Sequence, residues 1–350
     1  MTEYRVIYIG PNGPFQRGED YGTQASDEIG TAVAAYQSHF SNTRNMDWNR
    51  VREAAGAHIT PVEEALPELM EELRGIAAGS KQDILDIMAI NCRYELLHYP
   101  FEKECTSFAL LSETTEDGHV YVGQNWDNRP FAMTHSVILH TTLPDGTRIM
   151  GLTEGGQLSR NGISTKGIGL AANSLRSSRD FAGVGIPVSI LRRHLLSLNT
   201  AAQMEQAVIN APRSVSVNYM LADAQNMAVD VEALSFQPHI FRPKDGIITH
   251  ANHILGDPSV DISKGGRFRG ERLRELLERQ HGHITLDYIM ACLKDHQGLP
   301  ESICSHISQE QDTVHKLWQT NASIIYDLTA LKGWICWGPP CQGEYKEYVL

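Results

Sequence analysis

Apolar residues follow a helical spacing in the first hundred residues of the chain and an alternating spacing in much of the remainder. In the first part, apolar positions three and four residues apart predict helices over residues 25–40, 61–79 and 83–91. From residue 105 onward, short β-rich runs bounded by glycine, asparagine or aspartate predict strands over 105–111, 119–125, 136–141, 148–153, 167–173, 217–222, 228–232, 322–329 and 334–337. Further helices are predicted over 187–197, 200–209, 269–280 and 285–295.

These blocks of strands and helices do not alternate strictly, so they favour a layered α+β fold. With 350 residues, of which 41% are hydrophobic, the chain is long enough to bury a large core. No low-complexity linker separates the two parts. We therefore expect one domain of two interwoven segments: a mainly helical segment, residues 1–104, and a segment of residues 105–350.

The predicted hairpin that begins at residue 105 carries the most distinctive chemistry of the chain. Cys105 opens its first strand, Asp117-Gly118 supplies the turn, and Trp126 and Asp127 follow the second strand. This pairing places Asp127 beside the first residue of the first strand. A carboxylate there can orient an amine or hold a substrate ammonium group, whereas a helix cap or a turn would explain the same aspartate without function.

Cys105 is a candidate nucleophile that lacks an obvious base. A free cysteine has a pKa near 8.5, so only about a few per cent is thiolate at neutral pH. If Cys105 became the first residue of a new chain, its own α-amine, with a pKa of about 7.7 to 8.0, could accept the thiol proton. The same thiol could make the cut by attacking the carbonyl of Glu104. The alternative is a buried structural cysteine, because free cysteines usually pack.

A tetrahedral intermediate at such a cysteine needs hydrogen-bond donors for its oxyanion. Asn173, at the end of the predicted strand 167–173, and Asn252, after the apolar pair Ile247-Ile248, are candidates. An asparagine that ends a strand is also a common turn former. Both interpretations stay open at the level of the sequence.

The overall charge and the apolar runs limit the choice of partners. The formal net charge of −12 disfavours nucleic acid or an anionic membrane as the main partner. No apolar run approaches the roughly 18 to 20 residues of a membrane helix. The first residues do not resemble a signal peptide, nor the last three a peroxisomal signal, so we expect a cytoplasmic protein.

The cysteine and histidine spacings do not predict a metal site. The six cysteines show no paired C-x-x-C spacing, which indicates neither a disulfide framework nor a zinc site and favours reduced thiols. Cys336 and Cys341 flank Gly338-Pro339-Pro340 and are interpreted as incidental thiols at a turn. His250 and His253 could be imagined as ligands in a metal hydrolase, but they lie in a predicted loop without a nearby acidic third ligand. We therefore predict no metal and no cofactor.

Several segments together resemble a known family. They are Cys105-Thr106-Ser107, 123–127 (GQNWD), 250–253 (HANH), 13–22 (GPFQRGEDYG), 73–79 (LRGIAAG), 91–95 (NCRYE), 302–304 (SIC), 324–327 (IIYD) and 338–341 (GPPC). In order and spacing they resemble the isopenicillin-N acyltransferase (acyl-CoA:6-aminopenicillanic acid acyltransferase) family, peptidase family C45 of the N-terminal nucleophile (Ntn) hydrolases. The resemblance extends over nearly the whole chain.

The resemblance implies a four-layer αββα fold and autoproteolysis between Glu104 and Cys105. The products, residues 1–104 and 105–350, would stay associated as a small and a large subunit. By the family pattern Cys105 is the nucleophile, its new amine the base, Asn252 an oxyanion donor, and Asp127 assists near the nucleophile. Thr106, Trp126 and Asn173 are further candidates for oxyanion or substrate contacts.

The same resemblance implies that an acyl group passes from an amide or thioester to the cysteine and then to an amine or water, with a coenzyme A thioester as an optional cosubstrate. Two departures from the family pattern matter. Glu104 stands where the penicillin enzyme has glycine. Shortly before the segment that corresponds to 324–327, that enzyme has a basic residue, whereas this chain has Lys316-Leu317-Trp318. These differences make penicillin synthesis an unsafe inference and keep two alternatives: hydrolysis of a small amide, as in the similar insect β-alanyl-amine hydrolases, and a non-catalytic small-molecule binding protein.

Overall fold

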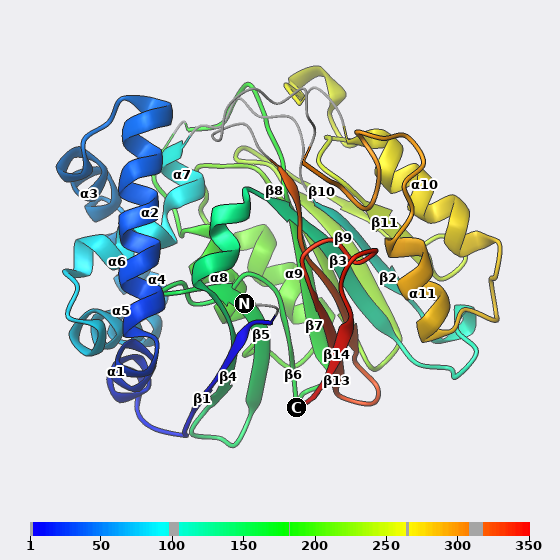
Figure 1. The fold of residues 1–350 in the computed structure, drawn as a ribbon, viewed down its shortest axis with the longest axis horizontal. Coiled ribbons are helices and arrows are strands. Elements are labelled where there is room, and N and C mark those ends of the chain that lie inside the picture. Colours follow the sequence, from blue (N-terminus) through cyan, green and yellow to red (C-terminus); the bar gives the residue numbers. More distant parts are fainter. Residues whose placement is uncertain (1–2, 98–104, 182, 264–265, 308–317) are drawn as a thin grey trace.

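Two β-sheets lie face to face in the computed structural model, and helices cover the outer face of each sheet (Figure 1). The structure describes residues 3–97, 105–181, 183–263, 266–307 and 318–350. The layers therefore follow the order helix, sheet, sheet, helix, and the α+β four-layer prediction is confirmed. None of the helices in the described ranges combines the length and the apolar composition that crossing a bilayer requires.

The larger sheet has eight strands in the spatial order β1-β4-β5-β6-β7-β8-β9-β10. Their bounds are β1 (Arg5–Ile9), β4 (Ser136–Thr142), β5 (Arg148–Glu154), β6 (Gly162–Ser164), β7 (Ile168–Ser174), β8 (Val217–Asp223), β9 (Met227–Ala233) and β10 (Pro238–Phe241). All neighbours are antiparallel except β1, which pairs parallel with β4. Because β1 precedes residue 105 and β4 follows it, the two segments of the chain share one sheet.

The smaller sheet has six strands in the order β11-β2-β3-β12-β13-β14 and contains the predicted hairpin. Their bounds are β11 (Ile247–His250), β2 (Thr106–Leu110), β3 (Tyr121–Asn128), β12 (Gln319–Asp327), β13 (Lys332–Trp337) and β14 (Tyr345–Val349). All its pairings are antiparallel. The hairpin strands β2 and β3 thus lie in the interior of the sheet rather than at its edge.

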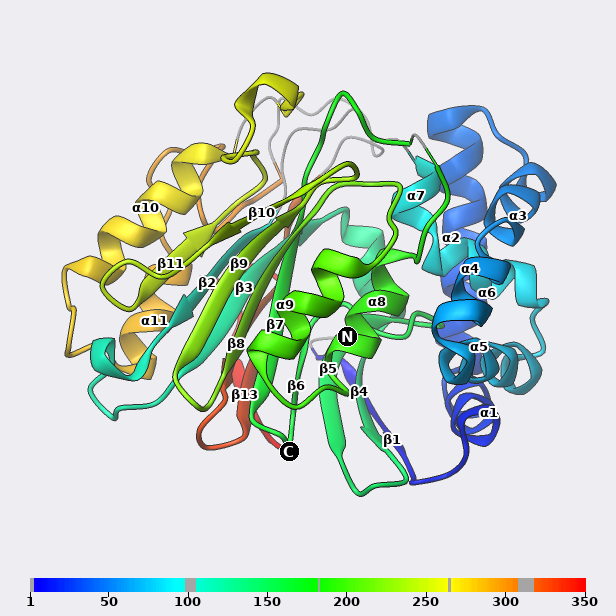
Figure 2. The ribbon, with the colours of Figure 1, turned by 180° about the vertical axis from the view of Figure 1, so that it is seen from behind.

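The helices fall into three groups (Figures 1 and 2). The first precedes the hairpin: α1 (Pro14–Gln24), α2 (Ser26–Arg44), α3 (Trp48–Gly56), α4 (Ile59–Ala65), α5 (Pro67–Ser80), α6 (Ile84–Asn91) and α7 (Arg93–Leu97). The second, α8 (Val188–Leu195) and α9 (Ala201–Asn210), lies over the larger sheet, and the third, α10 (Arg267–Glu278) and α11 (Leu286–Leu293), over the smaller one.

Strand alternation decides which side chains face which layer. On β2, Ala109 contacts the apolar cluster between the two sheets, as does Cys105 just before the strand, whereas Phe108 and Leu110 contact the cluster under α10 and α11. By the same period, Ser107 faces the other sheet. We call these the inter-sheet face and the helix-side face of the hairpin.

The helical segment before residue 105 departs from the prediction at one point. Residues 61–79 were expected to form one helix, but α4 ends at Ala65 and α5 begins at Pro67. A proline has no N–H and restricts the residue before it, so Leu66 adopts a non-helical conformation and the helix is interrupted. Helix α5 then packs closely on α1, where a Cβ atom at Gly18 or Gly75 would overlap the carbonyl oxygen of the facing helix.

Candidate active site

The side chain of Cys105 lies in the layer between the two sheets, immediately before β2, and is 6% exposed. Thr106 pairs with Asn125 on β3, so the same register places Cys105 opposite Trp126. On its other side, β11 pairs with β2 as far as His250, which lies opposite Ser107, and Asn252 follows two residues after β11 ends. Trp126 is therefore the partner of the candidate nucleophile on β3, and Asn252 lies in the segment just after the strand on its other side.

Asp127 lies within β3, not after it as the sequence predicted. The strand was expected to end at Asn125 but continues to Asn128, because β12 pairs with it through this end across an irregularity next to Thr320. The thiol of Cys105 lies 3.9 Å from the backbone carbonyl oxygen of Asp127. The carboxylate points to the helix-side face, where its Oδ1 accepts a hydrogen bond of 2.7 Å from the hydroxyl of Thr320.

Asn252 is held on both sides of its amide. Its Nδ2 donates to the carbonyl oxygen of Ser174 at 2.9 Å, and its Oδ1 accepts from the Arg269 guanidinium at 2.7 Å. Arg269 is buried, so the contact is shielded from water. An amide held in this way keeps a constant orientation, which an oxyanion donor requires.

Asn173 contacts the hairpin from the opposite sheet. Its Nδ2 donates to the hydroxyl of Ser107 at 2.7 Å and to Oδ1 of Asn218 at 3.0 Å. Ser107 lies two residues from Cys105 on the inter-sheet face, about 7 Å along the strand. The structure therefore places Asn173 beside the strand of the candidate nucleophile, but both hydrogens of its amide already have acceptors.

A chain of buried polar groups continues from Asn218 across the inter-sheet layer. Asn218 donates to the carboxyl group of Asp230, and Nε2 of His250 lies 2.9 Å from Glu232 and 3.9 Å from Asp230. Asn173, Asn218, Asp230 and Glu232 come from three neighbouring strands of the larger sheet, whereas His250 comes from β11 of the smaller one. The layer thus contains a buried cation between two acidic groups.

The pKa values of this cluster differ with the contacts of each group. Burial alone would lower the pKa of His250, but Asp230 and Glu232 outweigh burial and raise it to about 9. Burial raises the pKa of Asp230 to about 6. The pKa of Glu232 is instead lowered, because its hydrogen bonds to His250 and to the backbone N–H groups of Leu255 and Gly256 outweigh the cost of burial.

These contacts contradict the metal-hydrolase alternative at His250 and His253. His250 lies in β11 rather than in a loop, and its two ring nitrogens contact the carbonyl oxygen of Ala251 and the carboxylate of Glu232. Both nitrogens therefore donate hydrogen bonds, and neither has a lone pair for a metal ion. Burial and repulsion from His250 lower the pKa of His253, which stacks on His250, to about 4.

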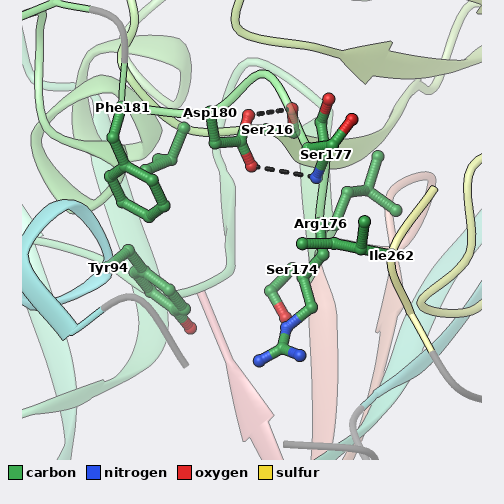
Figure 3. A pocket seen from close by; sticks show the side chains of 11 residues that line it. Tyr94, Ser174, Arg176, Ser177, Asp180, Phe181, Ser216 and Ile262 are labelled. Carbon is green, nitrogen blue, oxygen red and sulfur yellow. Dashed lines mark hydrogen bonds between the residues drawn. The ribbon is translucent and has the colours of Figure 1, made fainter. Parts of the chain in front are cut away.

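A cavity of about 280 Å³ lies beside Ser174, at the end of β7 (Figure 3). Ser174, whose carbonyl oxygen accepts the hydrogen bond from Asn252, lines its wall. Tyr94 lines the opposite side, and its hydroxyl accepts a hydrogen bond of 3.2 Å from Arg160. The Arg160 guanidinium in turn lies 4.0 Å from the centre of the Trp126 ring, so contacts connect the cavity wall to the position opposite Cys105.

The lining of this cavity combines apolar and polar groups. Asp180 accepts hydrogen bonds from the hydroxyl of Ser216 at 2.6 Å and from the backbone N–H of Ser177 at 3.1 Å, which fixes one wall (Figure 3). Arg176 adds a guanidinium group to the lining. The apolar lining comes from Leu175, Phe181, Val215 and Ile262. Such a lining suits a small acyl group with a polar substituent.

The remaining predicted site residues are placed as follows. Trp126 is buried on the inter-sheet face, whereas Thr106 is fully buried and by strand alternation points to the helix-side face, away from the thiol. Glu104 lies outside the described residues. Sequence reasoning missed Asp230 and Glu232, although their positions two apart within the apolar run 228–233 already indicate a strand with a polar inner face.

Comparisons with known proteins find one family whose model matches more than half of this chain. The model of the family described as acyl-coenzyme A:6-aminopenicillanic acid acyl-transferase matches residues 114–342. The 40 kDa form of acyl-coenzyme A:6-aminopenicillanic-acid-acyltransferase from Emericella nidulans is 23% identical over 341 residues, 93% of this chain and 91% of that protein.

Two solved structures show weaker likeness. A mutant of conjugated bile acid hydrolase from Clostridium perfringens is 15% identical, with a TM-score of 0.45 over 70% of this chain and 97% of that one. Penicillin V acylase from Agrobacterium tumefaciens is 11% identical, with a TM-score of 0.48 over 66% of this chain and 82% of that one.

Proposed function

Since the chain belongs to the acyl-coenzyme A:6-aminopenicillanic acid acyl-transferase family, we propose that it is a self-processing enzyme whose nucleophile is Cys105. One observation carries the proposal. Cys105 stands immediately before an interior strand, with its side chain in the layer between the sheets and opposite Trp126, and the neighbouring strand β11 leads directly to Asn252. A purely structural cysteine would not need a place at the head of an interior strand.

The first reaction is cleavage of the chain itself. The Cys105 thiol attacks the carbonyl carbon of Glu104, the C–N bond breaks, and the former peptide nitrogen becomes the α-amine of Cys105. Water then hydrolyses the thioester, which restores the thiol and leaves a carboxylate on Glu104. Because β1 pairs with β4, this strand of the first segment would keep the two products joined in the larger sheet after the cut.

The second reaction is acyl transfer. The new amine accepts the thiol proton, the sulfur attacks the carbonyl of an amide or thioester, and the leaving amine or thiol takes a proton as the acyl-cysteine forms. An amine or water then attacks the acyl-cysteine and releases the product. We assign stabilisation of the oxyanion to Asn252, whose amide is fixed by Ser174 and Arg269.

We propose that Asp127 positions the α-amine. Its backbone carbonyl oxygen lies 3.9 Å from the Cys105 thiol, and its carboxylate accepts a hydrogen bond from Thr320. The acyl group would occupy the cavity lined by Ser174 and Arg176. The six cysteines are free thiols, which suits a reducing compartment such as the cytoplasm.

The intact mass of freshly purified protein under denaturing conditions tests the proposal. We expect two species, residues 1–104 and residues 105–350, and a single full-length species for Cys105→Ala. Cys105→Ser should cleave more slowly, since a hydroxyl is a poorer nucleophile than a thiol at neutral pH. Cys292→Ala, which removes a buried thiol on the helix side of the smaller sheet, is the matched control and should cleave like the natural chain.

A screen of amides and acyl-coenzyme A thioesters with the processed protein completes the test. We expect acyl-cysteine formation at Cys105, detected as a mass increase on the larger chain. Product release by Cys105→Ala at the natural rate would contradict the proposal. An intact natural chain whose Cys105 resists alkylation would instead support the alternative of a non-catalytic small-molecule binding protein.

A further inference from the structure

Four side chains that the proposed chemistry does not use converge on the helix side of the smaller sheet. They are His296, after α11; Cys304 and His306, between α11 and β12; and Cys341, between β13 and β14. One nitrogen or sulfur atom from each lies within 4.8 Å of those of the other three. Three separate parts of the chain therefore present two thiols and two imidazoles to one point.

Four of the six separations between these atoms are close to the edges of a coordination tetrahedron. The two sulfur atoms are 3.6 Å apart, Nε2 of His306 lies 3.5 and 3.3 Å from them, and the two Nε2 atoms are 3.0 Å apart. With Zn–S bonds of about 2.3 Å and Zn–N bonds of about 2.0 Å, a regular tetrahedron has S···S, S···N and N···N edges of about 3.8, 3.5 and 3.3 Å. We propose that these four residues form a structural Cys2His2 zinc site.

The donor set favours zinc. Two thiolates balance the charge of Zn²⁺, two neutral imidazoles complete four-coordination, and tetrahedral S2N2 geometry is typical of zinc. His296 and Cys341 are exposed, so an ion can reach the site without unfolding the protein. Because protein ligands occupy all four positions, the ion has no open position for a substrate and its role is structural.

A bound ion would fix the position of the segment 303–305, which makes hydrogen bonds to β3 and β12. The backbone carbonyl of Ile303 accepts a hydrogen bond of 2.9 Å from Asn125, and the N–H of Ser305 donates to the Thr320 hydroxyl at 2.9 Å. That hydroxyl donates to Asp127. Cys304 lies between Ile303 and Ser305, so an ion bound to Cys304 would fix both of these contacts.

The spacing of the ligands explains why the sequence did not predict this site. Cys304 and His306 are two apart and His296 lies eight residues before Cys304, but Cys341 is distant in the chain and no C-x-x-C pair is present. Cys341 was interpreted as an incidental thiol beside a turn, whereas its contacts with Cys304 and His306 support the proposed role as a ligand. Cys336 does not belong to the cluster.

Metal analysis of the full chain, purified without a histidine tag from medium containing zinc, tests the proposal. We expect about one zinc per chain for the natural protein and at least a five-fold lower content for Cys341→Ser. Cys336→Ser, near the same turn, is the matched control and should retain the zinc. Cobalt chloride added to protein freed of zinc should give thiolate-to-cobalt absorption with the natural chain and not with Cys341→Ser.

The readouts do not depend on enzymatic activity, and the proposal does not rest on the proposed function. A chelator should lower the melting temperature of the natural protein but not that of Cys341→Ser, which also shows that the variant is folded. A zinc content that Cys341→Ser leaves unchanged would overturn the proposal. So would a natural protein free of zinc that gives no cobalt band, or one in which Cys304 and Cys341 form a disulfide under reducing conditions.

Discussion

The two faces of the β2–β3 hairpin differ in the kind of polar group that each buries. The inter-sheet face includes Ser107, and it leads through asparagines to the cluster of Asp230, Glu232 and His250, which carries buried charge. On the helix-side face, the Asn125 amide donates to backbone carbonyl groups of neighbouring segments. The helix-side face also buries the Asp127 carboxylate, but there the hydrogen bonds of Asn125 and Asp127 anchor the hairpin, whereas the inter-sheet face leads to a buried imidazole between two acidic groups.

This difference shows that the position of a residue along a strand does not by itself reveal its role, because the face to which the side chain points also matters. Cys105 lies opposite Trp126, the residue before Asp127, yet the Cys105 thiol and the Asp127 carboxylate point to different faces of the hairpin. The thiol lies 3.9 Å from the backbone carbonyl oxygen of Asp127. The Asp127 carboxylate lies on the helix-side face, where it accepts a hydrogen bond from Thr320. The Thr320 hydroxyl in turn accepts one from Ser305, the residue after the proposed zinc ligand Cys304.

The largest effect is expected from removing the buried cation. His250→Leu leaves Asp230 and Glu232 facing each other without a positive charge, and we expect a loss of about 3–5 kcal/mol in the free energy of unfolding. Urea denaturation measures it. His253→Gln, in the stacked neighbour, should cost less than about 1 kcal/mol. If the two variants had the same free energy of unfolding, the stability of the protein would not depend on the positive charge of His250.

Removing the amide of Asn252 should affect catalysis more than stability. Asn252→Ala deletes the proposed oxyanion donor, and we expect cleavage and turnover to slow by roughly 10²–10³-fold. The time course of the intact mass measures the cleavage step. An Asn252→Ala chain that is folded and cleaves at the natural rate would remove Asn252 from the proposed mechanism.

The stability of the inter-sheet face should also depend on pH. The folded protein holds the proton of His250 with a pKa of about 9, above the ordinary value of 6.5, so its contribution is complete below about pH 6.5 and is lost as the pH rises through about 9. The shift corresponds to about 3 kcal/mol. Comparing urea unfolding at these two pH values for the natural chain and His250→Gln isolates this contribution, and equal losses in both proteins would contradict it.

A smaller loss of stability is expected when a side chain of the helix-side face is removed. Asn125→Ala leaves the carbonyl groups of Leu293 and Ile303 without their side-chain donor, which should cost about 2 kcal/mol. Urea denaturation measures the loss, and the proportion of cleaved chain should change by less than for Asn252→Ala. An Asn125→Ala protein that is fully stable but cannot cleave would reverse the roles assigned to the two faces.

Much of the fold followed from local patterns, and the exceptions have local or long-range causes. Strands such as 136–141 and 217–222 were predicted close to their observed bounds because alternation depends only on neighbouring residues. The helix over 61–79 was split by Pro67, a signal present in the sequence but not used. The strand β3 ran past Asn125 because β12, almost two hundred residues later, pairs with it.

The sequence by itself determined the α+β character, the hairpin with Cys105 at its head, and the candidate residues Asp127 and Asn252. Tertiary structure alone decided which face each side chain joins, that Asn173 meets Ser107 from the other sheet, and that His296, Cys304, His306 and Cys341 converge. The physical reason is distance along the chain. Periodicity and turn chemistry act over a few residues, whereas these contacts arise only when separate layers pack against one another.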